Sequence, residues 1–72
     1  MRNQEHQAMA GHPVEVYFEF VPLGRQVKVV AIDAASGVEV SIVAPAGASQ
    51  RDMETIALRK LTKRLTDLAE GA

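Results

Sequence analysis

A strict two-residue alternation of apolar and polar side chains is the feature that most constrains this fold. Within Val14–Val21, valine or phenylalanine stands at each even position, with glutamate or tyrosine at the odd positions between them. Such alternation indicates a strand with one buried face. Val27–Asp33 is rich in β-branched residues and predicts a second strand, and Val38–Ala44 alternates again as a third. Turn-forming residues separate the three strands at Pro22–Arg25 and Ala34–Gly37.

The register of these strands can be predicted if each connection is a four-residue hairpin loop. Phe18 then lies opposite Val29, and Val29 lies opposite Ile42, so that one face of the sheet is wholly apolar. A slip of one residue would send every side chain to the wrong face. The same register places Glu19 opposite Lys28 on the reverse face, which predicts a favourable cross-strand pair.

The last segment predicts a helix over residues 50–69. Ser49 with Asp52 resembles a capping box, with aspartate in place of the usual glutamate or glutamine. A helix of this length measures roughly 30 Å, so its C-terminal half should overhang the sheet. The apolar stripe recurs at helical spacing and comprises Ala57, Leu58, Leu61, Leu65 and Leu68.

These patterns predict an α+β fold in which a three-stranded antiparallel β-meander is followed by one C-terminal α-helix packed on one face (β-β-β-α). Residues 13–70 are expected to form this single domain. Residues 1–12 lack periodicity and are expected to form a flexible N-terminal tail.

The small size of the chain limits how it can be stabilised. A single core in fewer than roughly 80 residues rarely supplies more than about 5 kcal/mol. The 72 residues include no cysteine, which excludes disulfides and thiolate metal sites. Self-association is the remaining way in which such a small core could gain stability. The net charge of −1 gives no global field for nucleic acid or a membrane, and no apolar run or leader is present, so a cytoplasmic location is expected.

One stretch of the chain resembles a family of short bacterial proteins of unknown function. The matching motifs are VYFEF at Val16–Phe20, VKV-x-AID within Val27–Asp33, G-x-EVSIV-x-P within Gly37–Pro45, and ALRKL at Ala57–Leu61. The resemblance implies a compact β-meander-plus-helix unit that forms a dimer. It implies no activity, cofactor or partner for any position.

The polar side chains favour structural roles over catalysis. The acidic residues of the strands should lie on a solvated face, and Asp33 should accept hydrogen bonds within the turn that contains Ser36. No histidine of the predicted domain could activate a serine. His6 and His12 alone are too few ligands for a metal site. We therefore expect no enzyme activity, no metal and no cofactor.

The leading hypothesis is a non-enzymatic interaction module that acts as a homodimer. The second strand is apolar on both faces although one helix can cover only one of them, and an exposed apolar patch often marks a contact site. The dimer would bury this patch or exchange helices across Pro45–Ala48, and a different protein partner is the alternative occupant. The candidate interface residues are Tyr17, Val30, Ile32, Val43 and Ile56.

A second hypothesis is weak nucleic-acid binding through the basic side of the helix. Four positive charges within two turns could contact a few phosphates. No aromatic residue lies on the helix for base stacking, however, which disfavours this hypothesis. The candidate contacts are Lys28, Arg59, Lys60, Lys63 and Arg64.

Overall fold

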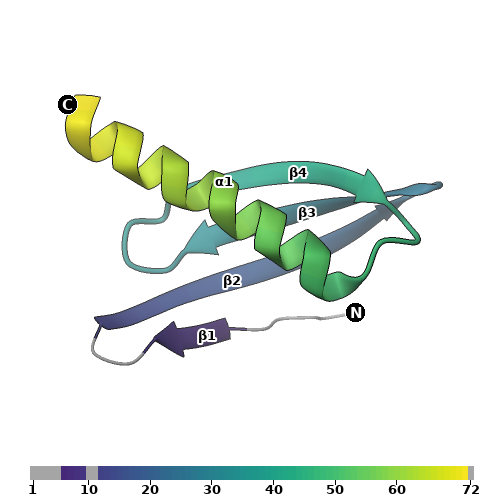
Figure 1. Ribbon diagram of the computed structural model, residues 1–72, viewed down its shortest axis with the longest axis horizontal. Coiled ribbons are helices and arrows are strands. Elements are labelled where there is room, and N and C mark those ends of the chain that lie inside the picture. The colour runs from purple at the N-terminus through teal and green to yellow at the C-terminus, as the bar shows by residue number, and fades with distance from the viewer. Residues whose placement is uncertain (1–5, 10–11, 72) are drawn as a thin grey trace.

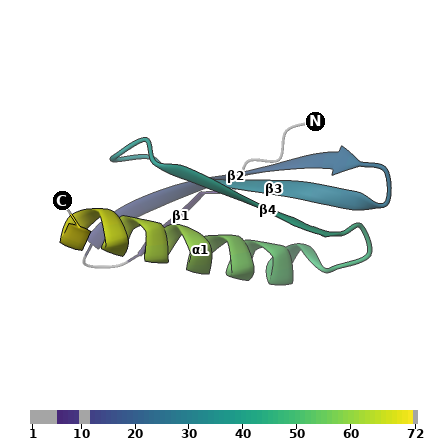
Figure 2. The ribbon, with the colours of Figure 1, turned by 90° about the horizontal axis from the view of Figure 1, so that it is seen from above.

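The fold is a single antiparallel sheet with one helix on one face. A computed structural model of the chain describes residues 6–9 and 12–71, with side chains from Glu15 onward. The elements in chain order are β1 (His6–Met9), β2 (His12–Leu23), β3 (Gln26–Asp33), β4 (Glu39–Pro45) and α1 (Gln50–Gly71). Neighbouring strands pair in the order β1-β2-β3-β4 (Figure 1). Figure 2 shows α1 beneath the sheet, so the predicted meander with a C-terminal helix on one face is confirmed.

Strand β1 was not predicted. It pairs with the beginning of β2, with Gln7 opposite Val16 and His6 opposite Tyr17. The predicted N-terminal tail is therefore corrected at His6–Met9, where backbone pairing forms a strand without a clear apolar alternation in the sequence. The prediction is also wrong at His12, the last residue of the predicted tail, because it begins β2. Residues 1–5 and 10–11 lie outside the described residues.

The first hairpin corrects the predicted register. Leu23 pairs with Gln26, which leaves a loop of two residues in place of the predicted four. Gly24 has a φ of +63°, as the first central residue of a type II′ turn requires. The predicted pairing is therefore wrong by two residues, and Glu19 lies opposite Val30, not opposite Lys28. A shift of two leaves every side chain on its predicted face, because the side-chain period of a strand is two.

The second hairpin confirms its prediction, with Ala31 opposite Val40 and Val29 opposite Ile42. The Asp33 amide donates to the Val38 carbonyl over 2.9 Å, and a carboxylate oxygen of Asp33 accepts from the Ser36 amide over 3.0 Å. The predicted role of Asp33 as an acceptor for the turn is thus confirmed.

Pro22 lies within β2 without disrupting the β2–β3 ladder. The Ala34 amide donates to the Glu15 carbonyl over 3.0 Å, so the odd-numbered residues of β2 direct their backbone groups toward β3. The nitrogen of Pro22 consequently faces the opposite edge of the strand, where a missing N–H removes no hydrogen bond to β3.

Helix α1 begins where the sequence predicts. The Ser49 hydroxyl oxygen accepts from the Asp52 amide over 3.1 Å, which caps the first turn. The buried residues of the helix are Met53, Ala57 and Leu61. Met53 was missing from the predicted stripe, although it stands four residues before Ala57. Leu68 is 46% exposed on the C-terminal turns, which extend past the start of β4 as expected (Figure 1).

The core lies between α1 and the sheet face that it covers. Val29 and Leu61 are its largest fully buried side chains. Partly buried residues, including Phe20, Leu58 and Leu65, pack around it. The buried residues of the core are Val16, Phe18, Val29, Ala31, Ala44, Met53, Ala57 and Leu61.

Candidate interaction surfaces

The sheet face opposite α1, here termed the open face, carries no described helix (Figure 2). The register arranges its side chains in rows that run across β2, β3 and β4. One row holds Glu19, Val30 and Ser41, and the next holds Val21, Lys28 and Val43. The residues of the open face are Tyr17, Glu19, Val21, Leu23, Gln26, Lys28, Val30, Ile32, Glu39, Ser41, Val43 and Pro45.

Val30 corrects part of the predicted interface. It lies on the open face and outside the core under the helix, as its position in β3 predicts, yet it is only 7% exposed. Strand β3 is flanked by β2 and β4, so side chains on both neighbouring strands surround this position. The prediction that Val30 offers a water-exposed contact is therefore wrong.

The other predicted interface residues do not form one exposed patch. Tyr17 and Ile32 are half-buried at one end of the open face, whereas Val43 is 57% exposed near the other end. Ile56 is 49% exposed but belongs to α1, on the covered side of the sheet. The structure thus places Tyr17, Ile32 and Val43 on the open face and separates Ile56 from them.

Two exposed apolar residues of the open face were missed by the sequence analysis. Val21 is 37% exposed and Leu23 is 49% exposed, and both lie toward the same end of the sheet as Val43. The sequence predicts Leu23 in a loop, which is wrong because Leu23 pairs with Gln26 at the end of β2. Recognising Gly24-Arg25 as a two-residue turn would have placed Leu23 on the strand and on this face.

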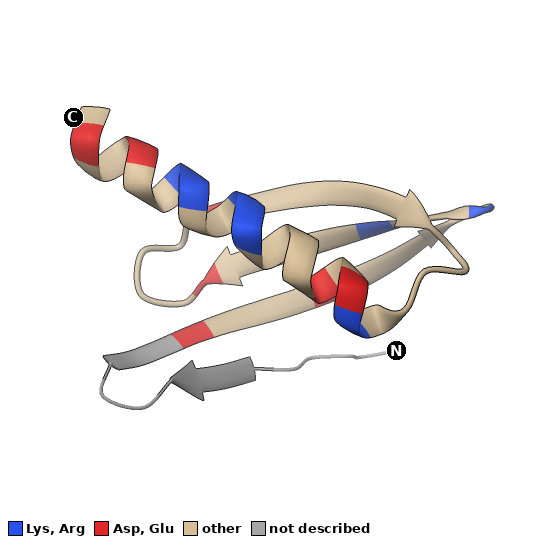
Figure 3. Cartoon of the chain, viewed as in Figure 1, with Lys and Arg blue, Asp and Glu red and all other residues tan. Residues whose placement is uncertain are grey.

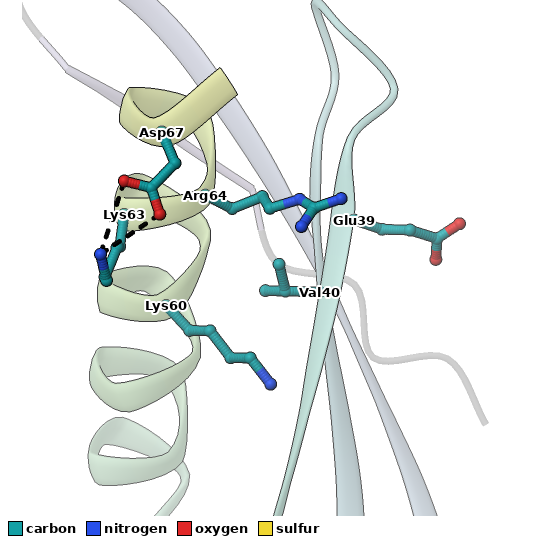
Figure 4. A pocket seen from close by; sticks show the side chains of 6 residues that line it. All are labelled: Glu39, Val40, Lys60, Lys63, Arg64 and Asp67. Atoms are coloured by element: carbon teal, nitrogen blue, oxygen red, sulfur yellow. Dashed lines mark hydrogen bonds and ion pairs between the residues drawn. The ribbon is translucent and has the colours of Figure 1, made fainter. Parts of the chain in front are cut away.

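The basic residues of α1 are partly engaged by neighbouring groups. The Lys60 amine donates to the Ser41 carbonyl of β4 over 2.8 Å, and Lys63 forms an exposed ion pair of 3.2 Å with Asp67. The guanidinium of Arg64 extends over Val40, as Figure 4 shows. These residues and Glu39 line a groove of about 360 Å³ between the helix and β4.

The predicted nucleic-acid contacts do not share one surface. Lys28 lies on the open face, whereas the other four residues lie on α1. Arg59 borders a different groove from Arg64, together with Thr55, Leu58, Thr62 and Lys63. Acidic residues flank the basic turns of the helix on both sides (Figure 3). The basic surface that reaches β4 is therefore reduced to Lys60, Lys63 and Arg64.

The described residues offer no metal cluster and no helix that could cross a membrane. No group of three or more histidine, cysteine, aspartate or glutamate residues in this part of the chain could hold a metal ion. No described helix is both long enough and apolar enough to be a membrane span. The side chains of His6 and His12 lie outside what the structure describes.

Fold and surfaces together define a class: a small β-meander module with one helix-covered face and one open face. Over residues 13–68 the chain matches the family described as "Domain of unknown function (DUF6898)", and it belongs to that family. The expected membership of a family of unknown function is thus confirmed. No curated protein and no solved structure matches the chain.

Proposed function

We propose that this protein is a small, non-enzymatic interaction module that forms a homodimer through the open face of its sheet. The observation that carries the proposal is the exposure of Val21, Leu23 and Val43 on a face that no described helix covers. Apolar groups gathered in this way gain free energy when a partner removes them from water. The proposal includes the bacterial origin implied by the resemblance and the cytoplasmic location expected from the sequence.

A second copy of the chain suits this face because its charges are self-complementary. Glu19 and Lys28 stand in adjacent rows of the open face, and neither has its opposite charge directly across the ladder. In a face-to-face dimer whose two-fold axis crosses the strands, the row of Glu19 in one copy lies over the row of Lys28 in its partner. The dimer would bring these opposite charges close together among the apolar side chains, because Lys28 lies between Val21 and Val43 on the central strand.

Light scattering coupled to size-exclusion chromatography tests the proposal on the full chain. We expect the mass of a dimer at micromolar concentration. The Val43→Glu variant places a charge on a side chain that is 57% exposed in the single chain, so it should fold and elute as a monomer. A wild-type protein that is monomeric throughout this concentration range would overturn the proposal.

Ile56→Glu is the matched control, because Ile56 is similarly exposed, at 49%, but lies on α1. It should leave the dimer intact. A dimer that survives Val43→Glu would instead support exchange of helices across Pro45–Ala48, which leaves the open face uncovered. Comparing the circular dichroism spectra of the two variants shows whether each has kept the fold.

A further inference from the structure

The outer edge of β4 presents backbone groups that no described strand uses. The Asp33 amide donates to the Val38 carbonyl, and the Ala46 amide donates to the Arg25 carbonyl, each over 2.9 Å. These bonds fix which residues of β4 face β3, because the direction alternates along a strand. It follows that Glu39, Ser41 and Val43 direct their N–H and C=O groups away from the sheet. In the described part of the chain, β4 is an edge strand.

One of these outward groups is occupied by the helix. The Ser41 carbonyl accepts the Lys60 amine over 2.8 Å, and this contact brings α1 alongside the edge. The Ser41 amide and the amides of Glu39 and Val43 have no described acceptor. The edge therefore keeps a row of donors beside a row of positive side chains.

The groove next to this edge is basic on the side that faces β4. Lys60 and Arg64 both reach from α1 toward the strand, whereas the Glu39 side chain points away from the helix (Figure 4). Lys63 is paired with Asp67, but Arg64 has no ionic partner among the described residues. Val40 supplies the apolar floor beneath Arg64.

We propose that this edge binds an extended acidic segment of another protein as an additional strand. The backbone of the segment would accept hydrogen bonds from the outward amides of β4. Its alternate side chains would face the groove, where glutamate or aspartate would pair with Arg64 and Lys60. This site uses the backbone of Val43, whereas the apolar patch of the open face uses its side chain, and strand addition requires no dimer.

A second copy of the chain fits this edge poorly. Two β4 strands paired about a two-fold axis near Ser41 would bring the Lys60 side chains of the two copies together. The positive charges of Arg64 and Lys60 would then face the same charges of the partner, and like charges brought together are unfavourable. Charge complementarity thus selects an acidic segment.

A labelled peptide of alternating glutamate and valine is the probe, and fluorescence anisotropy measures its binding to the full chain. We expect saturable binding that weakens as the ionic strength rises. Arg64→Glu should raise the dissociation constant at least about tenfold, because it replaces attraction with repulsion in the groove. Arg59→Glu changes the net charge equally but lies outside this groove, so it should have an effect of less than about threefold.

Hydrogen exchange distinguishes strand addition from simple charge attraction. Saturating peptide should slow the exchange of the Ser41 and Val43 amides, which face outward, while the Val40 and Ile42 amides, which already face β3, change little. The same peptide with prolines in place of the valines lacks half of the strand's donors and should bind at least about tenfold more weakly.

The proposal would be overturned by absence of binding, by equal effects of the two arginine variants, or by exchange rates at Ser41 and Val43 that the peptide leaves unchanged. A mixed-sequence single-stranded oligonucleotide is the competing probe. Tighter binding of the oligonucleotide without protection of these amides would assign the basic groove to nucleic acid instead. Light scattering on the same samples reports the dimer separately, so the two proposals can fail independently.

Discussion

The two faces of the sheet bury their side chains by different means. On the covered face, Val29 is fully buried between β3 and the helix, in contact with the core. On the open face, Val30 is 7% exposed without belonging to that core. Adjacent residues of one strand are therefore both buried, one under a packed helix and the other among its neighbours in the sheet.

This difference teaches that burial in a central strand does not require a second layer. It also locates the exposed apolar surface: not at the middle of the open face, but at the end where Val21, Leu23 and Val43 lie. Packing on the covered face should contribute most of the free energy of folding. Substitutions of exposed residues on the open face should cost little stability, so these residues can serve binding. Four predictions test this division.

Leu61→Ala should have the largest effect, because Leu61 is 1% exposed at the centre of the covered face. Truncation of a buried leucine costs about 2–5 kcal/mol, which equals most of the stability expected for so small a core. Urea denaturation followed by far-ultraviolet circular dichroism measures the loss. Leu68→Ala, at a site that is 46% exposed, is the control and should cost less than about 1 kcal/mol. Equal losses would mean that the helix is not anchored through Leu61.

Gly24→Ala tests the turn that aligns both faces. A Cβ atom at Gly24 meets nothing within 4 Å, so the cost comes from its φ of +63° and should be about 1–2 kcal/mol. Gly47→Ala is the control: its surroundings are equally open, and its φ is not in the left-handed region. It should change the free energy of unfolding by less than about 0.5 kcal/mol. If the two variants are equally stable, the type II′ turn is not the native connection.

Val29→Ala and Val30→Ala compare the two faces directly within one strand. Val29→Ala should cost about 2 kcal/mol, because the truncated side chain leaves a cavity beneath the helix. Val30→Ala should cost about 1 kcal/mol less, since water can fill the space on the open face. The difference between the two free energies of unfolding is the quantity to measure. A larger loss at Val30 would show that the open face carries more of the packing energy than its single layer suggests.

Val43→Ser should have the smallest effect, because the side chain is 57% exposed. We expect the monomer to change by less than about 0.5 kcal/mol when it is measured at concentrations low enough to dissociate the proposed dimer. At higher concentration the wild type should gain stability relative to the variant. A loss above 1 kcal/mol in the dilute protein would place Val43 in the packing of the single chain.

The sequence predicted the faces of the strands better than their pairing. Alternation assigned Phe18 and Val29 to the covered face correctly, because an error of two residues in the register does not change sides. The same error produced the false pair of Glu19 with Lys28. The predicted four-residue loop is wrong at Pro22 and Leu23, which belong to β2, because Gly24 and Arg25 complete the turn alone.

The surfaces were less predictable than the core, because they depend on how the elements meet. Burial of Val30 depends on side chains of two other strands, and the contact of Lys60 with Ser41 depends on the rotation of α1 over β4. Neither can be derived from the periodicity of one segment. The burial of Met53, by contrast, is predictable from the sequence, because its spacing from Ala57 and Leu61 continues the helical stripe.

Pro22 makes one edge of the sheet less suited to the addition of another strand than the other edge. Its nitrogen faces the outer edge of β2, beyond the described pairing with β1, and leaves a missing donor in the row that an incoming strand would need. Strand β4 also carries a proline on its outer edge, Pro45, but this proline is the last residue of the strand, and Glu39, Ser41 and Val43 keep their outward N–H groups. A further strand is therefore disfavoured beside Pro22, whereas along β4 it would meet three outward N–H groups before the strand reaches its own proline.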